Sequence, residues 1–402
     1  MLGKVDSRTM REMNRALLLD MIREGQTVSR TDLARRSALT KPTVSAIVDM
    51  LLDEGIVREV GFGVSPSRKG RRSRLLELND DAVAFVGMHF GVRQTTVAVA
   101  DARGQIRTRT THRSFRGQPG QAIRMVPSLV TAALRESKLP RSRLQGVGVA
   151  IPGLVDQATG TCVLAPNLRW YDVPLRGELS RALRAPVIVR NITQAAAVAE
   201  GRLGSARGVR SFAWVYVGTG VGAALVADGR VLYGKNGFSG ELGHCAVHGN
   251  SALCACGRTG CIETVASGTA IEAAARASAK GVVVPASNGA GSRKIDAQAV
   301  AIAARAGDEE ARRILAHAGE YLGMGISYLL NLFNPEMVVL GGRVIQAGNH
   351  LLDPVRASVS AHAMRGDGIP IALSTVGDDI MLRGAVLLAM EGDRVEGTSA
   401  AA

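Results

Sequence analysis

The first eighty residues change from helical to alternating spacing of apolar positions. Residues 14–24 carry their apolar side chains along one face of a helix. A second, short helix is predicted over 31–37, because the Ser29 hydroxyl just before it suits an N-cap. Further along, residues 56–60 and 74–78 flank a tip rich in Gly, Ser and Pro, which predicts a β-hairpin.

A longer helix is predicted over residues 41–54, between the second helix and the hairpin. Thr40 can cap it, and Pro42 falls in its first turn, where a missing amide proton costs nothing. Gly55 suits the left-handed residue that often ends a helix. Three helices with a tight turn before the third, followed by a hairpin, are typical of a winged helix-turn-helix. The alternative is a three-helix domain that binds protein.

A winged helix-turn-helix binds duplex DNA with the start of its third helix in the major groove. Hydroxyl and ammonium groups on the exposed side of that helix suit phosphates and base edges. The hairpin tip is strongly basic and can place arginines in a narrow minor groove. The expected DNA-binding residues are Thr40, Lys41, Thr43, Ser45, Arg68, Lys69, Arg71 and Arg72.

Beyond residue 81 the pattern becomes that of an α/β domain. Two strands are expected within 84–101, and another over 212–217, which runs into the glycine loop 218–222. Such a loop lets backbone amides approach a phosphate closely. A long helix over 308–332 precedes a strand that ends in two glycines. The repeated strand and glycine loop indicate two related α/β halves that face a cleft.

Charge and hydropathy narrow the class of partner. The formal net charge of +14 favours a polyanion. The basic stretch 103–143 is interpreted as a solvated, arginine-rich surface. No apolar run approaches the roughly 18 residues of a membrane span, and the N-terminus lacks the apolar core of a secretory signal. We therefore expect a cytoplasmic protein without a membrane partner.

The cysteines point to a metal. Without an export signal, their crowding favours metal binding over disulfides. Three of them form a Cys-x-Cys-x4-Cys motif, and zinc requires four ligands, so the fourth would be His244, Cys245 or His248. A closed structural zinc site is expected, with three of its ligands being Cys254, Cys256 and Cys261.

Several motifs resemble those of the ROK family, which combines repressors and sugar kinases on an actin-like, two-lobed fold. Residues 29–57 are similar to the winged helix of its repressor branch, and IPGLVD (151–156) and APNLRWYDVPL (165–175) to its sugar-side loops. GELGH (240–244), followed by CACGRTGCIE (254–263), is the most specific match. The resemblance covers almost the whole chain. It implies an N-terminal winged helix-turn-helix and an α/β sugar-kinase-like domain of two lobes.

The resemblance also assigns roles to single residues. It implies that the zinc ligands are His244, Cys254, Cys256 and Cys261. It implies that the sugar contacts are Asn167, Asn191, Glu241, His244 and Glu263. Amides and carboxylates suit the fixed hydroxyls of a pyranose. The zinc would orient the His244 ring at the ligand site.

Two departures from the family's kinases argue against phosphoryl transfer. Where the kinases have an Asn-Asp pair, whose aspartate is the general base, this chain has Asn191 and Ile192. Where they have a phosphate loop similar to Asp-x-Gly-Gly-Thr, this chain reads HFGVR over 89–93, without a carboxylate for Mg²⁺. Ile192 also removes a hydroxyl acceptor from the sugar site, so the sugar could be less polar, or the site vestigial.

The sequence thus predicts a repressor of carbohydrate-metabolism genes that binds operator DNA as a homodimer or homotetramer and responds to a sugar or sugar derivative. The expected domains are 1–80 for the winged helix, 81–190 with 380–392 for the first lobe, and 191–379 for the second. Two alternatives stay open. One is an ATP-dependent sugar kinase with a DNA-binding appendage, and the other is a repressor controlled by protein sequestration.

Overall fold

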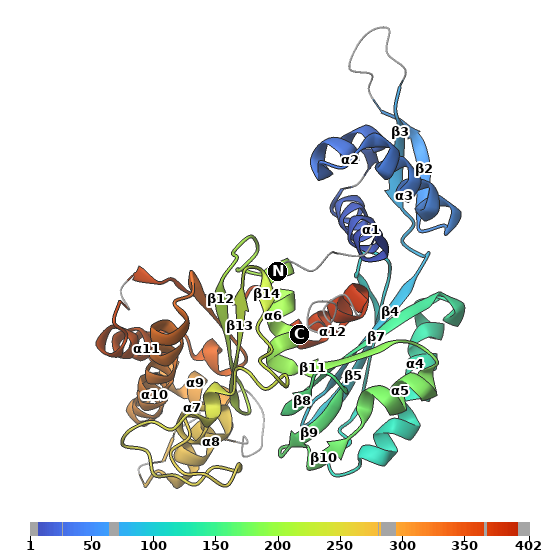
Figure 1. Ribbon diagram of the computed structural model, residues 1–402. Helices are drawn as coiled ribbons and strands as arrows, with labels where there is room; N and C mark the ends of the chain where they lie inside the picture. The colour runs from blue at the N-terminus through green and yellow to red at the C-terminus, as the bar shows by residue number, and fades with distance from the viewer. Residues whose placement is uncertain are drawn as a thin grey trace.

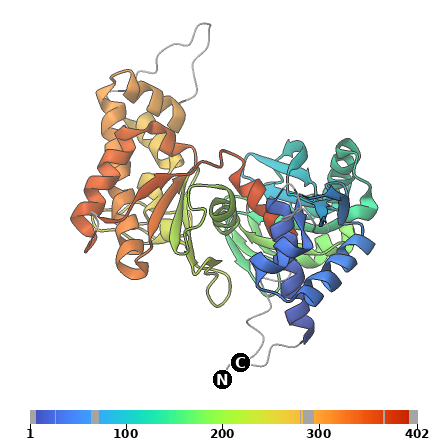
Figure 2. The same ribbon diagram turned by 90° about the horizontal axis from the view of Figure 1, so that it is seen from above.

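The computed structural model describes residues 7–25, 27–63, 72–279, 281–282, 295–365 and 368–392. These residues form a winged domain and two α/β lobes (Figure 1). The winged domain sits at one end of the first lobe, and helices α6 and α12 lie between the two lobes (Figures 1 and 2). None of the helices in these ranges is long and apolar enough to cross a bilayer.

The winged domain has the expected three helices and hairpin, with one further strand. Ser29 and Thr40 cap the second and third helices, accepting from the Asp32 amide at 3.1 Å and the Thr43 amide at 3.3 Å. A short N-terminal strand adds to the hairpin in the order β1-β3-β2. The elements are α1 (Ser7–Glu24), β1 (Val28–Ser29), α2 (Arg30–Ser37), α3 (Lys41–Asp53), β2 (Val57–Phe62) and β3 (Arg74–Leu78).

The end of α3 confirms the role expected for Gly55. Gly55 has φ +68° and donates its amide hydrogen to the Leu52 carbonyl oxygen at 2.9 Å. The amide of Ile56 donates to the Leu51 carbonyl oxygen, also at 2.9 Å. This pair of bonds is a Schellman motif, which satisfies carbonyls that the helix leaves open. The motif turns the chain directly into the wing.

The first lobe is built on a five-stranded sheet of order β11-β7-β4-β5-β6. Helices α4 (Pro119–Ser137) and α5 (Leu175–Leu183) pack on one face, and α12 (Ile380–Glu391) packs on the other. The strands are β4 (Ala84–Phe90), β5 (Gln94–Ala100), β6 (Ile106–Arg113), β7 (Leu144–Ile151) and β11 (Val187–Asn191). A small sheet of β8 (Leu154–Asp156), β9 (Thr161–Ala165) and β10 (Trp170–Val173) extends the lobe.

The second lobe has a matching sheet of order β14-β13-β12-β15-β16. Its strands are β12 (Phe212–Val217), β13 (Val221–Ala227), β14 (Arg230–Val231), β15 (Met337–Gly341) and β16 (Ile371–Leu373). Its outer helices are α7 (Glu263–Ala266), α8 (Gly268–Ala277), α9 (Ala297–Arg305), α10 (Glu309–Phe333) and α11 (Asn349–His362). They bury an apolar core against one face, while α6 (Ile192–Leu203) packs on the other.

Helix α12 touches both lobes at very short range. A Cβ atom on Gly148 of β7 would lie 1.9 Å from the Ala385 carbonyl oxygen of α12. A Cβ atom on Gly384 of α12 would lie 1.9 Å from the Ala195 carbonyl oxygen of α6. Only glycine permits these two backbone approaches. The helix therefore connects the first sheet to the helix that packs on the second.

The arginines and the lysine of the basic stretch 103–143 form the exposed surface that we expected, with the exception of Arg103. The side chain of Arg103 is only 18% exposed, and it is paired with Asp80. Arg107, 41% exposed, is paired with the buried Asp101. These arginines carry structural contacts, because tertiary packing places acids and open carbonyls beside them. The composition of residues 278–293 predicts a flexible surface excursion, and that of residues 395–402 predicts a disordered tail. The first segment lies mostly, and the second wholly, outside the described residues.

Candidate functional site

The start of α3 presents polar groups at the surface of the winged domain. Thr40 and Lys41 are exposed. Thr43 and Ser45, which we expected to be exposed, are half-buried. The hydroxyls of Thr40 and Thr43 are 2.8 Å apart, so they satisfy each other at the helix start.

The wing carries several ion pairs. Arg58 is paired with Glu77 at 3.2 Å, and Arg74 with Glu59. These acids neutralise arginines on the two strands of the hairpin. The sequence places the other basic residues of the hairpin in its tip. Arg72 is exposed. The other three expected tip residues, Arg68, Lys69 and Arg71, lie outside the described residues.

Four sulfur and nitrogen ligands converge in the second lobe. The ligand atoms of His244, Cys254, Cys256 and Cys261 all lie within 4.8 Å of one another. The sulfurs of Cys256 and Cys261 are 3.7 Å apart, and the Cys254 sulfur is 3.7 Å from His244 Nδ1. Two sulfurs bound at about 2.3 Å to a tetrahedral ion would be roughly 3.8 Å apart. The cluster is therefore compact enough to hold a metal ion.

The loop geometry explains why these ligands meet. Gly257 and Gly260 have φ values of +87° and +83°, which lets the loop reverse between its cysteines. Burial, with hydrogen bonds and charge from the neighbouring thiols, raises the pKa of Cys261 to about 12. A bound cation would oppose this rise in pKa, because its positive charge stabilises the thiolates. Of the three candidates for the fourth ligand, the fold brings His244 to the cysteines, while Cys245 is exposed.

A carboxylate pair adjoins the metal cluster. Glu241 Oε2 lies 3.8 Å from His244 Nε2, on the side of the ring opposite the cysteines. Burial raises the pKa of Glu241, the electrostatic influence of His244 opposes this rise, and the charge of Glu263 adds to it. Glu263 Oε2 accepts a hydrogen bond from the Val221 amide at 3.0 Å. One imidazole therefore faces the cysteine cluster with one nitrogen and a half-buried carboxylate with the other.

Asn191 is the last residue of β11 in the first lobe and the N-cap of α6. Its Nδ2 donates to the Gly153 carbonyl oxygen at 2.8 Å, and its Oδ1 caps α6 by accepting from the Thr193 amide at 2.7 Å. Gly153 packs closely against Ala165 at the end of β9. Asn167, which is exposed, lies two residues further along, in the turn between β9 and β10. Ile192 begins α6 and packs against an apolar cluster.

Residues 89–93, which correspond to the first phosphate loop of the kinases, have a histidine where that loop has a carboxylate to bind Mg²⁺. His89 stands at the end of β4, where the kinase motif has its aspartate. Burial, and then the positive charge of Arg109, lower the pKa of His89 to about 4, so this imidazole is neutral at pH 7. The Gly91 amide donates to the Gln94 carbonyl oxygen at 2.9 Å, which closes the loop as a tight turn.

The second glycine loop is partly filled by the chain's own side chains, which the sequence reasoning missed. A Cβ atom on Gly218 would lie 2.0 Å from the Tyr216 hydroxyl oxygen, so the phenol covers the loop. The Val221 amide is already taken by Glu263. The available signal was a large aromatic residue two positions before the glycines. Both features reduce the room and the free amides that a phosphate needs.

The fold and the site together define a class of protein: a winged helix-turn-helix fused to a two-lobed, sugar-kinase-like domain. The chain belongs to the ROK family, whose model matches residues 85–391. A winged helix-turn-helix DNA-binding model matches residues 14–58. These matches confirm the fold class and the family that the sequence motifs indicated.

Relatives of known description fall into two groups. The xylose repressor of Caldicellulosiruptor bescii is 28% identical over 94% of this chain and 96% of its own length. The glucokinase of Halalkalibacterium halodurans is 38% identical, but over 60% of this chain and 74% of its own. A crystal structure of a ROK family transcriptional regulator, described as a homologue of the Escherichia coli MLC protein, is 26% identical with a TM-score of 0.80, covering 94% of this chain and 95% of its own.

Proposed function

We propose that this chain is a DNA-binding transcriptional repressor of carbohydrate-metabolism genes, controlled by a sugar or sugar derivative and without kinase activity. One observation carries the proposal: a winged domain is joined to a kinase-like domain whose first phosphate loop has the neutral His89 in place of the motif's aspartate. The repressor relative matches the chain over both parts, whereas the glucokinase matches a smaller share.

The proposed effector site lies between the lobes. Its sugar contacts are Asn167, Asn191, Glu241, His244 and Glu263. The second-lobe groups Glu241, His244 and Glu263 are supported by their mutual contacts, and Asn191 by its position at the start of α6. Sugar hydroxyls would donate to the carboxylates and accept from the asparagine amides. Ile192 adds an apolar wall, which favours a sugar with a less polar edge.

The proposed metal is a structural zinc held by His244, Cys254, Cys256 and Cys261. When bound, zinc would supply folding energy to an irregular loop. It would also fix the tautomer of His244, because Nδ1 faces the cysteines and Nε2 remains to face Glu241 and the effector. The metal would thus support recognition without taking part in a reaction.

DNA binding is assigned to the winged domain. Thr40, Lys41, Thr43 and Ser45 would meet the major groove, and Arg68, Lys69, Arg71 and Arg72 the backbone and minor groove. Operators are bound by a homodimer or homotetramer, so that two recognition helices reach two half-sites. The proposed divisions are 1–80 for the winged domain, 81–190 with 380–392 for one lobe and 191–379 for the other. A sugar that binds one arrangement of the lobes more tightly shifts the population toward that arrangement.

The test is an operator titration at fixed salt. Duplexes from the region upstream of the chain's own gene are compared with random DNA, with and without D-xylose, D-glucose and their derivatives. Tight binding of one upstream duplex, changed at least severalfold by one sugar, is expected. Equal affinity for upstream and random duplexes contradicts the proposal.

Two observations favour a second candidate, an ATP-dependent sugar kinase with a DNA-binding appendage. The glucokinase relative has the highest identity of the three proteins compared, and the second glycine loop is retained. An ADP-release assay with hexoses and Mg²⁺ separates the two candidates. If the chain is a repressor without kinase activity, no ADP release above background is expected. ADP release that is lost in Glu241→Ala would instead support the kinase.

A further inference from the structure

The winged domain and the first lobe share one short connection. β3 ends at Leu78, and β4 begins at Ala84. The connection is tied to the winged domain by Asn79, whose side-chain amide donates to the Gly55 carbonyl oxygen at 3.0 Å. Its backbone amide donates to the Ile56 carbonyl oxygen at 2.9 Å. A single connection of this kind permits rotation unless a second contact restrains it.

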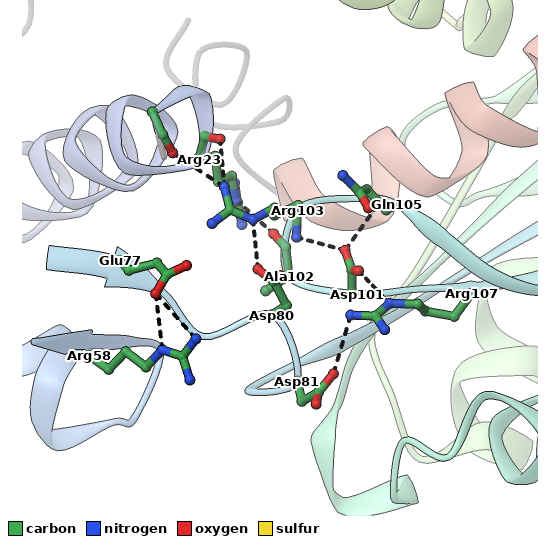
Figure 3. Close-up of polar contacts among 11 residues, drawn as sticks. Arg23, Arg58, Glu77, Asp80, Asp81, Asp101, Ala102, Arg103, Gln105 and Arg107 are labelled. Atoms are coloured by element: carbon green, nitrogen blue, oxygen red, sulfur yellow. Dashed lines mark hydrogen bonds and ion pairs between the residues drawn. The ribbon is translucent and has the colours of Figure 1, made fainter. Parts of the chain in front are cut away.

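The second contact joins the turn between β5 and β6 to the end of α1 (Figure 3). Arg23 Nε donates to the Ala102 carbonyl oxygen at 3.0 Å. Arg103 Nη1 donates in return to the carbonyl oxygens of Arg23 at 3.2 Å and Gly25 at 3.3 Å. The last carbonyls of a helix lack partners within it and carry partial negative charge, so a guanidinium suits this end.

Arg103 also binds the connection between the domains. Its Nε donates to Asp80 Oδ1 at 2.7 Å, and the Asp80 carbonyl oxygen accepts from the Ala102 amide at 3.0 Å. The Arg103 side chain is largely buried, so this ion pair is screened less than one at the surface. One guanidinium therefore joins α1, the connection and the first lobe (Figure 3).

The turn that presents Arg103 is held in one shape by Asp101. This buried carboxylate accepts from the backbone amides of Arg103 and Gln105, each at 3.0 Å, and from Arg107 Nε at 2.6 Å. Gly104 follows with φ +79° and lies against the Met390 sulfur of α12. Because contacts within the first lobe hold the shape of this turn, the Arg103 side chain is directed toward the end of α1.

We propose that Arg103 is a positioning residue that fixes the orientation of the winged domain on the first lobe. Apolar contacts also join the two parts, through residues such as Val83 and Phe85, but such contacts are not directional. A planar guanidinium donates to Asp80 and to the α1 carbonyls together only in one arrangement. The orientation so fixed sets the distance between the paired recognition helices of an oligomer. Only this last consequence rests on the proposed function.

Hydrogen exchange followed by mass spectrometry on the full chain tests the positioning itself. The variants are Arg103→Ala, Arg103→Lys and the control Arg116→Ala, which changes an exposed arginine three residues beyond the end of β6. In Arg103→Ala we expect about tenfold faster exchange at residues 18–25 and 79–84, with wild-type rates at 44–58 in the winged core. Arg103→Lys should lie between, because an ammonium cannot bridge all the acceptors, and Arg116→Ala should match the wild type.

Either of two exchange results overturns the proposal. Unchanged exchange in Arg103→Ala means that the apolar contacts alone hold the domain. Faster exchange throughout the winged domain means that Arg103 is needed for its folding and not for its orientation.

A second measurement uses duplexes that the wild-type chain selects from random sequence, rebuilt with different spacings between two half-sites. We expect Arg103→Ala to keep its affinity for a single half-site and to lose about tenfold of its preference for one spacing. A retained preference contradicts the positioning role. If the wild type selects no duplex, the proposed DNA binding fails, and the exchange result alone decides the role of Arg103.

Discussion

Gly384 of α12 lies so close to Ala195 of α6 that a Cβ atom on the glycine would stand 1.9 Å from the alanine's carbonyl oxygen. Helix α6 starts at the proposed effector site, and α12 packs on the sheet of the first lobe and ends beside the winged domain. The two helices therefore pack backbone against backbone at this point, where the first lobe meets the helix that packs on the second.

Gly384→Ala should destabilise the protein, although alanine favours helices by about 1 kcal/mol over glycine. The added methyl group would push α12 away from α6, and overpacking of this kind costs about 1–3 kcal/mol or more. Urea unfolding followed by Trp fluorescence measures the change. The matched control is Gly177→Ala in α5, where nothing lies within 4 Å of the added Cβ, so unchanged or higher stability is expected there. Equal effects of the two substitutions would contradict the packing argument.

Cys256→Ser should remove the bound metal and lower the stability of the second lobe, because a structural zinc site requires all four ligands. Metal content by mass spectrometry and the thermal midpoint measure both effects, and a strong chelator should reproduce them in the wild type. Cys245→Ser is the control, since Cys245 is exposed and lies outside the cluster. Wild-type zinc content in Cys256→Ser would exclude the proposed ligand set.

Glu241→Ala should abolish the response to the sugar while operator affinity without sugar is retained, because a half-buried acceptor for a sugar hydroxyl is lost. Removal of one such hydrogen bond to a charged group costs about 1.5–3 kcal/mol, or roughly ten- to a hundredfold in sugar affinity. Calorimetric titration with the sugar identified above checks this expectation, and zinc content must remain that of the wild type. Glu136→Ala, at an exposed position of α4, is the control. An undiminished response in Glu241→Ala would place the pocket elsewhere.

Lys41→Ala should weaken operator binding and reduce the slope of log affinity against log salt by about one, as expected for one lost phosphate contact. Lys41 is exposed at the first position of α3, and alanine preserves the helix. Gel-shift titrations at several salt concentrations give the slope. Lys235→Ala, an exposed lysine of the second lobe, should leave both quantities unchanged. An unaltered slope in Lys41→Ala would remove this residue from the interface.

His89 should make stability depend on pH. Its pKa of about 4 in the folded chain lies below the ordinary value of 6.5, so the unfolded chain binds more protons between these values. The free energy of unfolding is therefore expected to fall as the pH drops from 7 to 5, by about 1–2 kcal/mol from this group. His89→Gln should lose that contribution, whereas His317→Gln, at an exposed histidine of α10, should keep it. Denaturant midpoints of the three proteins at pH 7 and pH 5 measure this difference. An equal fall in the wild type and in His89→Gln would contradict the role of His89.

The sequence alone determined the local structure of the winged domain and three of the four ligands of the candidate metal site. Ser29, Thr40 and Gly55 specify helix ends through their own hydroxyls and backbone freedom, so neighbouring residues suffice to predict them. The close spacing of Cys254, Cys256 and Cys261, with glycines between the second and third cysteines, is typical of a metal-binding loop.

Only the tertiary structure decided which distant groups meet. Three contacts depend on how the elements pack together. His244 lies beside the thiols, the Tyr216 side chain covers Gly218, and Arg103 donates hydrogen bonds to the end of α1. Spacing along the chain carries no record of such contacts, because they are set by close packing between elements far apart in sequence. For the same reason, the arginine stretch that looked like a solvated surface contains the residue that we propose orients the winged domain.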